Sequence, residues 1–210
     1  MASAQTELKK PADTNLSLID EIRDRWSPRA FDSRPVEPLK LCSVLEAARW
    51  APSCFGEEPW RFIVGDKTAS PETHAMLADL LVPANRSWAE KAPVLIFSVA
   101  KLKFTYNNEP NRHAQHDVGL AVENLVLQAQ ALGLHTHQMG GIEHERALDV
   151  FGIPRGEFEV MAGIALGYMG SVDDLPKGLK ERELEPRTRK PLQDLVFARH
   201  WLGAFPICVS

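Results

Sequence analysis

Two short basic clusters lie near opposite ends of the sequence. The first is Arg25-Trp26-Ser27-Pro28-Arg29 and the second is Arg187-Thr188-Arg189-Lys190-Pro191. Each cluster combines guanidinium groups with a hydroxyl side chain, and guanidinium groups form charge-assisted, often bidentate hydrogen bonds with phosphate. These residue types therefore suit the binding of a phosphorylated ligand by side chains. Taken alone, each cluster is more typical of a solvated helix end or surface.

The overall composition sets the background for these clusters. The chain has 210 residues and a net charge of −4, so the clusters do not belong to a generally basic surface. This balance argues against non-specific nucleic-acid binding. The longest apolar stretches, such as residues 92–97, are too short to span a membrane. Residues 1–15 are polar and charged, which predicts a flexible arm and not a secretory signal.

The number and spacing of the cysteines indicate a reducing cellular compartment. Cys42, Cys54 and Cys208 form an odd and sparse set without metal-type spacing. Such a set is typical of a reduced, cytoplasmic protein.

The histidines offer a different chemistry. His113 and His116 are three residues apart in a predicted helix, and His135 and His137 alternate in a predicted strand. Four histidines and the adjacent carboxylate of Asp117 could bind zinc or iron, which would suit a metal-dependent hydrolase. No His-Glu-x-x-His motif is present, however, so we favour histidines at a surface or an interface and predict no metal. His144 is interpreted as the start of a helix.

The elements that must position these residues follow from periodicity and from Pro and Gly breaks. Residues 101–112 and 170–185 are expected to be irregular, and residues 197–210 form an apolar tail that packs on its own subunit or on a partner. Residues 16–196 are predicted to be one domain of mixed α/β, or α+β, class. Helices are predicted at 16–25, 38–50, 71–81, 113–132 and 143–150, and strands at 60–64, 94–100, 134–139 and 158–167.

The order of motifs along residues 16–196 resembles that of the FMN-dependent nitroreductase family. It starts at Arg25-Trp26-Ser27-Pro28-Arg29-Ala30-Phe31 and continues through residues 45–53, 59–62, 92–96 and 117–125. It closes with Gly140-Gly141, residues 152–154 and 165–168, and residues 187–192. The residues that the resemblance assigns to the cofactor are Arg25, Trp26, Ser27, Arg29, Pro52, Ser53, Cys54, Gly56, Gly140, Gly141, Arg187 and Arg189.

The resemblance also implies what these residues do. The two basic clusters would close on one FMN phosphate from opposite ends of the chain. Residues 52–54 would reach the flavin from the other subunit of a dimer. Gly140 and Gly141 would bring the backbone close to the isoalloxazine ring, where a side chain would obstruct.

The sequence departs from the family pattern in one segment. The family often has Ser at the position of Cys54, Asn at Gly56 and Gln at Glu58. A thiol is a weak donor, so the contact at Cys54 is altered, and the flavin contact at Gly56 is placed in doubt. Glu58 adds a negative charge that would either disfavour anionic substrates or hold Arg61. Trp60 is interpreted as an aromatic residue of the hydrophobic core.

The resemblance implies an intertwined homodimer with a central, mainly antiparallel sheet flanked by helices. It would bind FMN and pass a hydride from NADH or NADPH to a nitroaromatic, quinone or enone acceptor by a ping-pong mechanism. No nucleic-acid or membrane partner is expected, and no side chain is assigned as a catalytic acid or base because the flavin carries the hydride. The alternatives are a flavin-binding or flavin-modifying protein without reductase turnover and, less favoured, the histidine-based hydrolase.

Overall fold

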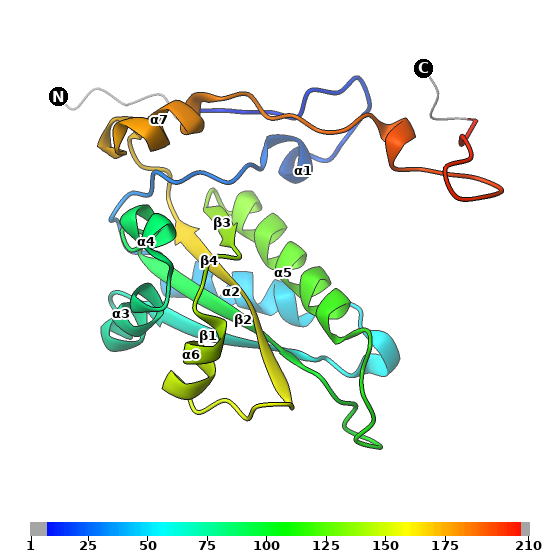
Figure 1. The fold of residues 1–210 in the computed structure, drawn as a ribbon. Coiled ribbons are helices and arrows are strands. Elements are labelled where there is room, and N and C mark those ends of the chain that lie inside the picture. The colour runs from blue at the N-terminus through cyan, green and yellow to red at the C-terminus, as the bar shows by residue number, and fades with distance from the viewer. Residues whose placement is uncertain (1–7, 207–210) are drawn as a thin grey trace.

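The computed structural model describes residues 8–206, so residues 1–7 of the predicted arm and 207–210 of the predicted tail lie outside the described residues. Its centre is a four-stranded sheet in the order β1-β2-β4-β3, with every neighbouring pair antiparallel (Figure 1). This architecture confirms the predicted fold class and all four predicted strands. Their bounds are β1 Trp60–Asp66, β2 Val94–Lys101, β3 His135–Met139 and β4 Phe158–Gly167.

Strand β2 is buried on both faces, as its continuous apolar run predicts. Leu95 and Phe97 pack into the core on one side of the sheet. Val94 and Ile96 pack into the core on the other side. The two cores follow from the alternation of side chains along a strand, which sends successive residues to opposite faces.

One face of the sheet is covered by α2 (Pro38–Arg49) and α5 (Ala114–Ala131). Helix α5 buries Val118 and Leu125 among others, in agreement with its apolar surface nearly all round. Trp60 is buried in the same core, as predicted.

The other face is covered by α3 (Pro71–Asp79), α4 (Pro83–Ala89) and α6 (His144–Val150). Helix α6 begins at His144, as expected. Helix α4 was not predicted, because it is short and mostly polar. Pro83 occupies its first turn, where a missing backbone N–H costs nothing, and the buried ring of Trp88 anchors it to the core.

The predicted first helix is much shorter than its apolar pattern indicates. Helix α1 spans only Asp20–Asp24, and Leu16, Ile19 and Ile22 are exposed. The pattern marks an apolar surface that residues 8–206 of one chain leave uncovered.

Residues 170–185 are not the solvated connection that their charge suggests. They form η2 (Val172–Asp174) and α7 (Lys177–Leu184), and they bury Leu175 and Glu183. After α7 the chain runs beside the N-terminal segment near α1 and then away from the sheet, through η3 (Leu192–Asp194) (Figure 1). Trp201 in this last stretch is 80% exposed.

Among residues 8–206, no helix is both long and apolar enough to cross a membrane.

Candidate cofactor-binding site

Arg187 fastens the C-terminal segment to the N-terminal one. Its guanidinium donates hydrogen bonds to the backbone carbonyls of Lys10, at 2.8 Å, and Arg23, at 2.9 Å. The Lys10 ammonium in turn lies 4.5 Å from the centroid of the buried Trp26 ring. The fold therefore brings the second basic cluster against the residues that lead into the first.

Three guanidinium groups gather at this junction. Burial lowers the pKa of Arg25, and the charge of Arg189 lowers it further, opposed by Glu123. Burial also lowers the pKa of Arg187, followed by the charges of Arg25 and Arg189. Among residues 8–206, no carboxylate lies within ion-pair distance of Arg25, Arg187 or Arg189. Like charges held together raise the free energy of the site, and an anion would lower it.

Arg29 differs from these three because a buried carboxylate neutralises it. The Glu183 side chain is 0% exposed and lies 3.4 Å from the Arg29 guanidinium. Its carboxylate also accepts the backbone N–H groups of Arg29, at 2.5 Å, and Ala30, at 3.2 Å. Glu183 thus docks α7 on the first basic cluster, and Arg29 has less charge to offer a ligand than Arg25.

Strand β3 leads from the basic junction to the glycine pair. The His137 Nδ1 atom lies 3.0 Å from the Pro28 carbonyl oxygen, and its ring centroid lies 4.5 Å from that of Trp88. Burial lowers the pKa of His137 to about 4, and the charges of Arg29 and Arg25 contribute further. A neutral imidazole can still donate from Nδ1 to the Pro28 carbonyl, so His137 links strand β3 to the first basic cluster.

The two glycines have different surroundings. A Cβ atom added to Gly140 would meet nothing within 4 Å. One added to Gly141 would lie 2.6 Å from Asn85 Nδ2 and 2.8 Å from Val82 Cγ2. The Gly141 carbonyl accepts the Val82 backbone N–H, at 3.1 Å, and the Asn85 amide, at 3.0 Å. Gly141 is therefore required by packing against α4, whereas the space beside Gly140 is free for a ligand.

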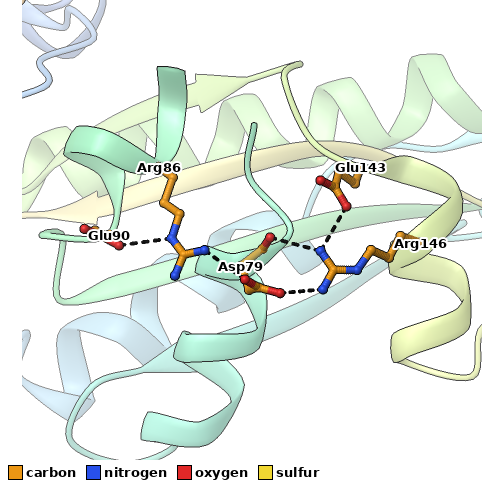
Figure 2. A network of polar contacts seen from close by, with 5 residues as sticks. All are labelled: Asp79, Arg86, Glu90, Glu143 and Arg146. Atoms are coloured by element: carbon orange, nitrogen blue, oxygen red, sulfur yellow. Dashed lines mark hydrogen bonds and ion pairs between the residues drawn. The ribbon is translucent and has the colours of Figure 1, made fainter. Parts of the chain in front are cut away.

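A surface network surrounds the turn that carries these glycines (Figure 2). Asp79 at the end of α3 accepts from Arg86 of α4, at 2.8 Å, and from Arg146 of α6. Arg146 also pairs with Glu143 at 3.0 Å, and Arg86 with Glu90 at 3.2 Å. Each exposed pair is worth little alone, but together they join α3, α4 and α6 around residues 140–143.

Residues 52–58 form a tight and strained segment. Phe55 and Glu58 have φ angles of 54° and 50°, and Gly56 has one of 66°. Left-handed backbone is unfavourable for residues with a Cβ, so other contacts must hold it. The buried Asp117 carboxylate accepts the Cys54 N–H at 2.9 Å, and Ser53 Oγ accepts the Glu58 N–H at 3.0 Å.

This segment is separate from the basic junction within one chain. Among residues 8–206, no hydrogen bond or ion pair joins residues 52–58 to either basic cluster. Arg61 contacts the backbone carbonyl of Glu58, at 2.9 Å, and not its carboxylate. A single chain therefore holds two separate groups of the predicted site residues: the basic junction with Gly140, and the strained loop.

The histidines do not converge. His113 precedes α5, His116 Nδ1 lies 2.9 Å from the Asp117 carboxylate, and His135 is buried in β3. Within the described part of the chain, no group of three or more potential metal ligands is arranged to hold an ion.

Sequence reasoning did not single out Glu183, and it weighed Asp117 only as a carboxylate beside the histidines. One signal was present for Asp117, which is a carboxylate in the first turn of a helix that is otherwise apolar. Glu183 lay in a run of charged residues, and its partner is 154 positions away, so no local pattern marks it.

The chain is similar in sequence and in structure to known proteins. The sequence model of the nitroreductase family matches residues 22–168. A solved oxidoreductase containing FMN is 36% identical, with a TM-score of 0.84 over 91% of this chain and 96% of its own. A 15.4 kDa protein of Mycolicibacterium smegmatis is 34% identical over 67% of this chain and 97% of its own. The major NAD(P)H-flavin oxidoreductase of Aliivibrio fischeri is 22% identical over 85% of this chain and 97% of its own. The chain therefore belongs to the nitroreductase family.

Proposed function

We propose that this protein is an FMN-dependent oxidoreductase that passes a hydride from NADH or NADPH to a small organic acceptor. The observation that carries the proposal is the junction of Arg25, Arg187 and Arg189, in which no guanidinium has a carboxylate partner among the described residues. The 36% identical solved relative contains FMN, and a more distant relative is an NAD(P)H-flavin oxidoreductase.

The residues present fit FMN. Arg25 and Arg189 would hold the phosphate, with Ser27 Oγ, which already accepts from Arg25 at 3.2 Å, beside them. Arg187 would add its charge while it anchors the C-terminal segment. The open space beside Gly140 would admit the edge of a planar ring. His137 contacts the Pro28 carbonyl of the first basic cluster and lies on β3, which leads to Gly140, so this strand would connect the phosphate and ring sites.

When bound, FMN supplies the acceptance and donation of a hydride at N5. The chain's own residues bind and orient the cofactor, and we assign none of them as an acid or base. Backbone groups at Gly140 and Gly141 are rigid because α4 holds the Gly141 carbonyl, and fixed dipoles stabilise developing charge better than mobile ones. NAD(P)H and the acceptor would use one open site in turn, which predicts ping-pong kinetics.

We further propose that the working form is a homodimer in which residues 52–56 complete the partner's site. The strained loop is presented outward, and Phe55 is 83% exposed. The apolar side of α1 and the tail, including Trp201, are also uncovered in the single chain. A second copy would cover these surfaces and bring the loop to the basic junction of the other subunit.

Steady-state assays on the flavin-loaded protein test the proposed reaction. NADH and NADPH oxidation should be measured without oxygen, with nitroaromatic, quinone and enone acceptors. Acceptor-dependent oxidation with parallel double-reciprocal lines is expected. A yellow protein that oxidises neither nucleotide with any acceptor would instead be a flavin-binding or flavin-modifying protein without turnover.

A further inference from the structure

The imidazole of His144 lies between two backbone carbonyl groups, behind the turn that carries the glycine pair. Its Nδ1 atom is 2.8 Å from the carbonyl oxygen of Val160 in β4. Its Nε2 atom is 3.3 Å from the carbonyl oxygen of Gly140. A neutral imidazole has a single N–H donor and can satisfy only one of these carbonyls, whereas an imidazolium donates to both. The arrangement is therefore complete only when the ring carries its second proton.

The Gly140 carbonyl belongs to the peptide beside which the proposed flavin ring would lie. This carbonyl also accepts the Ile142 backbone N–H at 3.0 Å. The N–H of Gly141, on the opposite side of the same peptide, donates to no group among residues 8–206. A donor on the carbonyl polarises a peptide and strengthens its N–H as a donor. His144 can therefore act on a ligand beside Gly140 without touching that ligand.

The charged groups around His144 favour its protonated form. It shares a cavity of about 310 Å³ with three of them, Glu145, Arg155 and Glu159. Arg155 contacts Glu145 and pairs with Asp149 at 2.8 Å, so its charge is compensated. Glu159 has no cation within ion-pair distance in the described part of the chain. An uncompensated carboxylate near an imidazole stabilises the imidazolium.

The remaining charges at the start of α6 belong to the surface network. Glu143 pairs with Arg146 at 3.0 Å, and Arg146 also pairs with Asp79 (Figure 2). Each carboxylate of this network has an arginine partner, so the network does not disfavour the imidazolium.

We propose that His144 is a positioning residue for the flavin: as an imidazolium it holds the Gly140 carbonyl and directs the Gly141 N–H to the flavin ring. The proposal rests on the proposed function, which assigns the ring to the space beside Gly140. The ring gains negative charge when it is reduced, and a fixed, polarised N–H stabilises that charge. The flavin should therefore be easier to reduce when His144 is protonated.

The reduction potential of the flavin-loaded protein tests this role across about pH 5 to 8, the range in which imidazole side chains normally change charge. His144→Gln keeps a polar side chain but cannot take up a proton. From the alkaline to the acid end, the equilibrium constant for flavin reduction should gain about three- to tenfold more in the wild type than in His144→Gln, the worth of one hydrogen bond. His200→Gln, which replaces an exposed histidine of the C-terminal stretch, should follow the wild type.

The amide of Gly141 gives a second measurement, which needs neither flavin nor turnover. Its proton chemical shift in the flavin-free protein should move with pH in the wild type and much less in His144→Gln. Flavin-loaded wild type and His144→Gln with parallel potentials, or Gly141 shifts that titrate equally in both, would overturn the role of His144 alone. Protein that takes up no flavin would overturn the proposed function together with this role.

Discussion

The buried carboxylate of Asp117 accepts a hydrogen bond from the backbone N–H of Cys54 at 2.9 Å, across 63 positions of sequence. Asp117 is 3% exposed and lies in the first turn of α5, the central helix. The bond fixes the strained loop to a long and largely buried helix, so the loop that we assign to the partner's flavin is preorganised.

Replacing Asp117 by Asn should loosen this loop. The amide keeps one acceptor but loses the charge that strengthens the bond, so we expect a loss of about 1–3 kcal/mol in stability. The Cys54 amide should exchange its hydrogen faster, measured by hydrogen–deuterium exchange. Glu109→Gln, an exposed carboxylate that precedes α5, is the matched control. Unchanged exchange at Cys54 in Asp117→Asn would contradict the assigned role.

Alanine substitutions at Gly140 and Gly141 should affect different properties, FMN affinity at Gly140 and stability at Gly141. Gly141→Ala would press on Asn85 and Val82 and should destabilise the apoprotein by about 1–3 kcal/mol, as overpacking does. Gly140→Ala has free space in the chain, so the apoprotein should keep its melting temperature. Its FMN affinity should nevertheless fall roughly tenfold, equivalent to about 1.4 kcal/mol, if the ring occupies that space. Full FMN affinity in Gly140→Ala would place the ring elsewhere.

Stability should depend on pH through His137. Its pKa is about 4 in the folded chain and about 6.5 when unfolded, so between these values only the unfolded chain binds the proton. The contribution of His137 to the free energy of unfolding is fully present above pH 6.5. It falls by roughly 3 kcal/mol as the pH drops to 4. Urea unfolding should show a shallower pH dependence in His137→Asn than in wild type.

His74 is a second buried histidine with a lowered pKa, caused chiefly by burial, so part of the wild-type dependence will remain. The exposed His113 provides the control, and His113→Asn should keep the wild-type slope. Equal slopes in His137→Asn and His113→Asn would show that His137 is not the group that titrates.

Glu183→Gln should undock α7 from the first basic cluster. The Gln side chain turns one acceptor into a donor facing Arg29, and a buried charged hydrogen-bond acceptor is worth about 2–3 kcal/mol. Urea unfolding should show that loss, and FMN should bind more weakly because Arg187 and Arg189 follow α7. Glu181→Gln, exposed on the same helix, should change neither quantity. If Glu183→Gln matched this control, the buried carboxylate would have no docking role.

The sheet and α5 could be predicted because their apolar periodicity is strong and local. Helices α4 and α7 could not, since each is short and mostly polar and buries only one large side chain, Trp88 in α4 and Glu183 in α7. The residue types suited to a phosphate could be predicted, but not which of the arginines are held in structural contacts. Arg29 and Arg187 make structural contacts with Glu183, Lys10 and Arg23, and only the fold reveals these partners.

The central claim is that the basic junction binds the phosphate of FMN. Isothermal titration of the apoprotein with FMN and with riboflavin, which lacks the phosphate, tests it most directly. Arg25→Ala combined with Arg189→Ala removes two charge-assisted contacts and should weaken FMN binding by about 100-fold or more. Riboflavin affinity should stay unchanged, and Arg182→Ala, exposed on α7, should bind both ligands like the wild type. A wild type that binds FMN no more tightly than riboflavin, or a double variant that keeps full FMN affinity, would contradict the claim.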